Sequence, residues 1–194
     1  CDFSDLRLSD AHAQFRKENI EARLYKADLN AIPIEDLAFD LVICRLVLQH
    51  IPTCDTVLAE FERIIKIGWQ VCVIDVDGLF HNLHPKSARL TELLHEMSAR
   101  IPIDFFIGRK LKQLLSNAGF KRITQEIMPM NFQGLDLQLE RELVAQRLTF
   151  AKTALIEAFG SPAKAAEFRD LYLSEIAFPN ACLFYNLFVV TGTK

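Results

Sequence analysis

Two carboxylates and a histidine follow the most apolar stretch of the chain, "QVCVIDVDG". Asp75 and Asp77 are two residues apart within it, and His81 comes four residues later. Because side chains alternate along a strand, Asp75 and Asp77 point to the same face. A carboxylate there could position a substrate or accept a proton from a hydroxyl or amine, and His81 could share the role. Helix capping and loop hydrogen bonds are the alternative. The three residues are candidate catalytic residues.

Further polar residues occur where the sequence predicts the ends of other strands. Asp2 opens the chain's first helical pattern, Asp28 closes the alternating run "ARLYKADL", and Arg45 follows the apolar "FDLVIC". In α/β proteins, ligands bind at the carboxyl ends of the strands. A line of polar residues at successive strand ends therefore predicts an extended ligand. Each residue also has a structural alternative: a helix cap for Asp2, a turn for Asp28, and a surface ion pair for Arg45.

Predicted strands and helices alternate along the chain, which indicates an α/β fold with right-handed crossovers. The predicted strands are near 22–28, 39–44, 70–78, 121–130 and 181–194. One predicted helix begins after Ser4, and a second begins after Pro52 and ends at Gly68. Others lie near 86–100, 107–119, 135–159 and 162–177. We expect one domain over residues 1–194, with a helical insertion at about 132–180 between the last two strands.

Composition narrows the class of protein. The 194 residues carry a formal net charge of −3 with no long block of one sign, which argues against a nucleic-acid-binding surface. No apolar stretch approaches the roughly 18 residues that a membrane span needs. The five cysteines are odd in number and form no C-x-x-C pair, so a reduced, cytoplasmic compartment is expected. His84 and His95 lack a partner set, and no metal site is predicted.

Several motifs occur in an order that resembles one enzyme family, over roughly residues 1–130 and the final strand. They are Asp2-x-Ser4 with Ala11, Asp28-Leu29 with Pro33, Phe39-Asp40-Leu41-Val42, Cys44-Arg45 with Leu48 and His50, Leu58-x-Glu60 with Arg63, and "IGRKLKQLLSNAGF". In this order and spacing the chain resembles the class I S-adenosylmethionine-dependent methyltransferases. The resemblance implies a Rossmann-like three-layer fold, with a mostly parallel sheet and an antiparallel last strand.

The resemblance also implies roles for individual residues. Asp2, with its neighbour Phe3, would bind the ribose hydroxyls of S-adenosylmethionine. Asp28 and the backbone of Leu29 would bind the adenine, and the backbone at Cys44 and Arg45 would bind the amino group of the methionine part. The implied reaction is in-line transfer of the methyl group to an acceptor, with catalysis mainly by positioning and exclusion of water. The near-neutral charge favours a small-molecule acceptor.

Two departures from the family pattern leave alternatives open. The usual P-G-G before the fifth strand is Ile67-Gly68-Trp69, and the seven glycines are all at least ten residues apart. No cofactor-cradling glycine loop exists in this chain. We expect the family's first strand and loop to lie upstream. The alternatives are a non-catalytic methyltransferase-like binding or scaffold domain and, with less support, a dinucleotide-dependent oxidoreductase.

The predicted insertion could form a lid or a homodimer surface. Its apolar face would consist of Leu135, Leu139, Leu143, Leu148 and Phe150. A plain packing role is the alternative for these residues.

Overall fold

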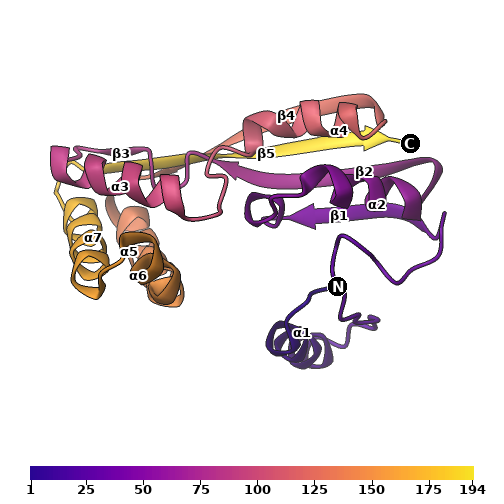
Figure 1. Cartoon of the computed structure of the whole chain (residues 1–194), viewed down its shortest axis with the longest axis horizontal. Coiled ribbons are helices and arrows are strands. Elements are labelled where there is room, and N and C mark those ends of the chain that lie inside the picture. Colours follow the sequence, from indigo (N-terminus) through magenta and orange to yellow (C-terminus); the bar gives the residue numbers. More distant parts are fainter.

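Five strands form one sheet in the computed structural model, which describes residues 1–194 (Figure 1). The strands are β1 (Phe39–Arg45), β2 (Ile65–Asp77), β3 (Leu83–His84), β4 (Lys121–Phe132) and β5 (Cys182–Thr193). β1 and β2 pair in parallel, whereas β5 pairs antiparallel with β2, β3 and β4. Only β5 therefore runs against the other strands. The predicted α/β fold with an antiparallel last strand is confirmed.

Seven α-helices connect and flank these strands. They are α1 (Asp5–Lys17), α2 (Cys54–Ile64), α3 (Ala88–Arg100), α4 (Leu111–Asn117), α5 (Gly134–Phe150), α6 (Lys152–Phe159) and α7 (Pro162–Ile176), with short 3₁₀ turns η1 (Leu48–His50) and η2 (Gly108–Lys110). Side-chain caps fix two of the helix starts that the sequence predicts. The Ser4 hydroxyl accepts a hydrogen bond from the Arg7 amide, and the Ser161 hydroxyl accepts one from Lys164, with Pro162 in the first turn.

Two sequence-based predictions of local structure were wrong. The helix expected to end at Gly68 ends at Ile64, because β2 already begins at Ile65 and Gly68 adopts a φ of 83° inside that strand. The run "ARLYKADL" forms no regular strand. It makes one isolated parallel bridge, between Asp2 and Lys26, because Asp2 is its sole strand-like neighbour.

Buried apolar side chains form two clusters around the sheet. The cluster over α2, α4, β1 and β2 includes Leu58, Val73 and Leu111, and the cluster in the helical insertion includes Leu94 and Phe168. Both clusters reach β5, which runs past the two groups of helices (Figure 1). The long last strand thus ties the insertion to the part of the sheet that carries the candidate site.

One face of β1 carries no covering helix. Phe39, Leu41 and Ile43 alternate along the strand and are 40%, 48% and 62% exposed. α1 contains no buried residue and lies apart from the sheet (Figure 1).

The apolar face expected on α5 is divided between the core and the surface. Leu148 packs into the insertion core, whereas Leu135, Leu139, Leu143 and Phe150 are exposed. None of the helices is long and apolar enough to cross a membrane.

Candidate functional site

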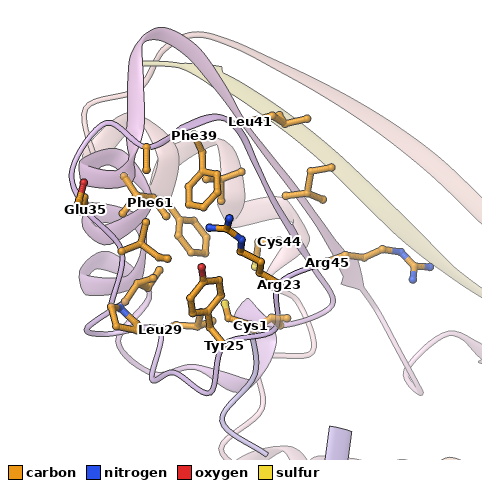
Figure 2. Close-up of a pocket in the computed structure, with 18 residues that line it drawn as sticks. Cys1, Arg23, Tyr25, Leu29, Glu35, Phe39, Leu41, Cys44, Arg45 and Phe61 are labelled. Carbon is orange, nitrogen blue, oxygen red and sulfur yellow. The ribbon is translucent and has the colours of Figure 1, made fainter. Parts of the chain in front are cut away.

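A cavity of about 800 Å³ lies beside β1 and α2. Its lining is mainly apolar and consists of Cys1, Arg23, Tyr25, Leu29, Ile32, Pro33, Ile34, Glu35, Ala38, Phe39, Leu41, Val42, Ile43, Cys44, Arg45, Val47, Phe61 and Ile64. Figure 2 shows Arg23 and Tyr25 among the apolar side chains, whereas the Arg45 side chain points away from them. The volume is within the range of small-molecule sites in proteins.

The cavity brings together three of the residues that the sequence suggested for cofactor binding, Leu29, Cys44 and Arg45. Arg45 turns its side chain outward (Figure 2), which agrees with a role through the backbone. Burial raises the pKa of the Cys44 thiol to about 12, with a smaller contribution from Asp75. Cys44 is therefore a neutral, small apolar side chain at this wall of the cavity.

Asp2, Phe3 and Asp28 do not line this cavity. Asp2 is half-buried, and its Oδ1 accepts a hydrogen bond of 2.8 Å from the Ser4 amide. Phe3 is 79% exposed. Asp28 Oδ1 accepts hydrogen bonds from the backbone and side-chain amides of Asn30, which lower the pKa of that carboxyl. In both aspartates Oδ2 makes no hydrogen bond, so one acceptor atom of each stays available.

Asp75 is completely buried, and its carboxylate accepts hydrogen bonds from backbone amides. Its Oδ2 accepts a hydrogen bond of 3.2 Å from the Gln49 amide, and its Oδ1 accepts one of 2.9 Å from the Val76 amide. Burial raises the pKa of Asp75, and these two hydrogen bonds partly oppose that shift. The carboxylate thus fixes η1, the turn that follows β1, to the end of β2.

Asp77 forms an ion pair with Arg109, which lies in η2, the turn before α4. Asp77 Oδ1 lies 2.6 Å from Arg109 Nη2, and Oδ2 accepts hydrogen bonds from Arg109 Nε and the Arg109 backbone amide at 2.9 and 3.0 Å. The side chain of Asp77 is 4% exposed. These contacts favour a structural role for Asp77. No sequence pattern indicates this pairing, because the two residues are 32 positions apart.

His81 lies in an aromatic environment away from the cavity. Its Nε2 is 3.0 Å from the Ser98 hydroxyl, and its ring centroid lies 4.9 Å from that of Phe106 and 5.4 Å from that of Phe105. Burial lowers the pKa of His81 to about 4, and the positive charge of Lys86 adds to the shift. The imidazole is therefore neutral near pH 7 and a weak base. Asp75, Asp77 and His81 each bind a different partner.

Sequence reasoning also missed residues that the structure places at the site. Arg23 and Tyr25 line the cavity although the sequence marked them only as parts of a strand. Gln49 is buried between the ends of β1 and β2. The structure contains no group of three histidine, cysteine or acidic side chains arranged to hold a metal ion.

Comparison with known proteins finds similarity to a methyltransferase domain in the part of the chain that lines this cavity. A family model described as a methyltransferase domain matches residues 1–73. The demethylmenaquinone methyltransferase of Lactobacillus johnsonii is 25% identical over 138 residues, covering 63% of this chain and 57% of the relative. The chain thus spans a little over half the length of this curated relative.

Solved structures share the fold at low sequence identity. YcgJ from Bacillus subtilis has a TM-score of 0.60 at 16% identity, covering 98% of this chain and 79% of that protein. Phosphoethanolamine N-methyltransferase 2 of Haemonchus contortus, solved with phosphomonomethylethanolamine and S-adenosylhomocysteine, has a TM-score of 0.54 at 16% identity. That comparison covers 100% of this chain and 42% of the other.

The [4+2]-cyclase SpnF also has this fold, with a TM-score of 0.58 at 17% identity over 99% of this chain and 63% of the cyclase. Proteins with different reactions therefore share this fold, and the fold does not by itself fix the reaction. The family model thus assigns residues 1–73 to a methyltransferase domain, and the solved structures show that the chain shares their fold.

Proposed function

We propose that this chain takes part in S-adenosylmethionine-dependent methyl transfer to a small-molecule acceptor. One observation carries the proposal. Every residue that lines the 800 Å³ cavity, from Cys1 to Ile64, falls within the segment that matches the methyltransferase domain. The cavity extends to the carboxyl end of β1, at Cys44 and Arg45, where ligands bind in α/β folds.

The residues present suit different parts of S-adenosylmethionine. The apolar lining around Leu29 suits an uncharged adenine ring. The unoccupied Oδ2 atoms of Asp2 and Asp28 suit the ribose hydroxyls and the adenine amine, because a carboxylate is a strong acceptor. The backbone at Cys44 and Arg45 would meet the amino group of the methionine part. When bound, the cofactor supplies a methyl group activated by a positively charged sulfur.

The roles of the three candidate catalytic residues follow from their contacts. Asp75 would hold the turn after β1 in position, and Asp77 would hold η2 through Arg109. His81 stays a candidate proton acceptor, although its pKa of about 4 makes it weak in this role. Methyl transfer needs no base when the acceptor atom has no proton to lose, and positioning of the two reactants is then sufficient.

A second candidate function is a non-catalytic binding or scaffold domain of the same fold. The observation that favours it is the spacing of the glycines, since no two lie closer than ten residues and no glycine loop can cradle a cofactor in this chain. Cofactor binding separates the two candidates.

Calorimetric titration of S-adenosylhomocysteine tests the proposal, both into this chain and into the protein expressed from its complete gene. We expect the protein expressed from the complete gene to bind S-adenosylhomocysteine with micromolar affinity. Asp28→Ala should weaken this binding about tenfold, as for the loss of a hydrogen bond to a charged group. Asp136→Ala changes an exposed acidic residue outside the cavity, so it is the matched control and should bind like the wild type. No binding by either protein, or preferential binding of a nicotinamide dinucleotide, would contradict the proposal.

The proposal includes a homodimer formed through α5. Leu135, Leu139 and Leu143 recur every four residues and are 70%, 55% and 46% exposed, so they form one apolar stripe on the helix. Light scattering should give twice the chain mass for the wild type and the monomer mass for Leu139→Glu. A monomeric wild type would remove this part of the proposal.

A further inference from the structure

A second cavity, of about 480 Å³, lies where the turn after β1 meets the starts of α2 and α4. Its lining includes Gln49, Asp55 and four isoleucines. Val47 lines the first cavity and Gln49 the second, so the two cavities flank the same short turn. The second cavity is therefore close to the carboxyl end of β1.

Gln49 is held rigidly by its backbone while its side chain lacks a partner. Its amide donates to Asp75, and its carbonyl accepts a hydrogen bond of 2.8 Å from the Asp104 amide. The residue is 6% exposed, and the side-chain Oε1 is buried without a hydrogen bond. Such an atom costs stability unless a ligand or water binds it. This amide is thus a buried polar group of the cavity with unused hydrogen-bonding capacity.

The remaining lining defines the shape and charge of a fitting molecule. The isoleucines at 51, 101, 103 and 107 form apolar walls, and the volume suits one or two rings. The ion pair between Asp104 and Lys110, at 2.5 Å, neutralises both charges, whereas Asp55 makes no ion pair. The Cys54 thiol donates to the Ile51 carbonyl and is already engaged. The residual negative charge disfavours an anionic ligand.

We propose that this second cavity holds the methyl acceptor, and that the acceptor is a neutral, ring-sized apolar molecule whose hydroxyl or N–H donates to the Gln49 amide oxygen. The inference rests on the proposed function, because it assigns the acceptor of that reaction. It separates this chain from an enzyme that takes a phosphorylated acceptor such as the phosphomonomethylethanolamine bound to the Haemonchus contortus protein.

Three related probes test the acceptor class on the wild-type protein. 2-Naphthol is neutral with a hydroxyl donor, 2-methoxynaphthalene lacks the donor, and 2-naphthyl phosphate is anionic. The side-chain amide signals of Gln49 in a ¹⁵N-correlation spectrum are assigned by their loss in Gln49→Leu. We expect 2-naphthol to shift these signals and to bind about five- to tenfold more tightly than 2-methoxynaphthalene, the range for one hydrogen bond. The phosphate should bind more weakly still.

Variants then link the binding to Gln49. Gln49→Leu and Gln49→Met should both reduce 2-naphthol affinity to that of the methoxy probe, whereas Gln113→Leu, on the exposed side of α4, should leave it unchanged. Thermal unfolding of each variant checks that it folds. The comparison among probes uses the wild type alone, so it stands even where a variant fails to fold.

Three outcomes would overturn the inference. Equal binding of the three probes without a shift of the Gln49 signals would mean that the amide binds ordered water only. Binding of 2-naphthol by a protein that binds no S-adenosylhomocysteine would refute the acceptor assignment together with the proposed function. Conversely, S-adenosylhomocysteine binding with no effect of Gln49 on 2-naphthol would leave the proposed function intact and remove this inference alone.

Discussion

At the scale of single residues, the half-buried His81 makes stability depend on pH. Its pKa is about 4 in the folded protein, below the value of about 6.5 in an unfolded chain. Between these values the unfolded state binds the extra proton, so stability falls as pH drops from 6.5 to 4. The resulting loss is about 2 to 3 kcal/mol.

Urea unfolding at several pH values between 4 and 7 measures this dependence. His81→Gln should lose less stability than the wild type over the same interval, because it has no imidazole to protonate. His84→Gln changes an exposed histidine and should behave like the wild type. Identical pH profiles for His81→Gln and the wild type would show that His81 does not cause the dependence.

At the scale of elements, Gly108 sets how closely η2 approaches the sheet. A Cβ atom at this position would lie 2.6 Å from the Phe188 ring and 3.0 Å from Asp77 Cβ. The glycine thus permits the neighbouring Arg109 to pair with Asp77, and this contact joins η2 to β2.

Gly108→Ala should therefore lower the free energy of unfolding by about 1 to 3 kcal/mol, as expected for overpacking against a buried ring. Lys112→Ala changes an exposed residue of α4 and should alter stability by less than about 0.5 kcal/mol. Urea denaturation measures both. Unchanged stability of Gly108→Ala would mean that η2 can move away from β5 without cost.

At the scale of the whole molecule, β5 joins the two apolar clusters. Leu183 belongs to the insertion cluster, whereas Phe188 and Val190 belong to the cluster formed with α2, α4, β1 and β2. Loss of either cluster would expose part of the same strand, which favours one cooperative transition.

Two signals can follow the two parts separately during thermal unfolding. The single tryptophan, Trp69, lies on β2, whereas the long helices α5 and α7 contribute strongly to far-ultraviolet circular dichroism. We expect tryptophan fluorescence and circular dichroism to give the same midpoint. Midpoints several degrees apart would show that the insertion unfolds independently, and that residues 1–194 are not one cooperative domain.

Local patterns in the sequence were sufficient for most of the elements. Alternating and fully apolar runs predicted β1, β2, β4 and β5, and Ser4 and Ser161 marked two helix starts, because hydrophobic period and capping are short-range properties. The same reasoning failed for "ARLYKADL", since a strand also needs neighbours that pair with it along its length.

The sequence by itself thus determined the order of most elements, the antiparallel last strand implied by the resemblance, and the position of Cys44 and Arg45 at the end of β1. Only the tertiary structure decided which polar groups meet. Asp77 pairs with Arg109 and Asp75 binds the Gln49 amide across 32 and 26 positions. Long-range contacts of this kind depend on how the elements pack, and neither spacing nor composition encodes them locally.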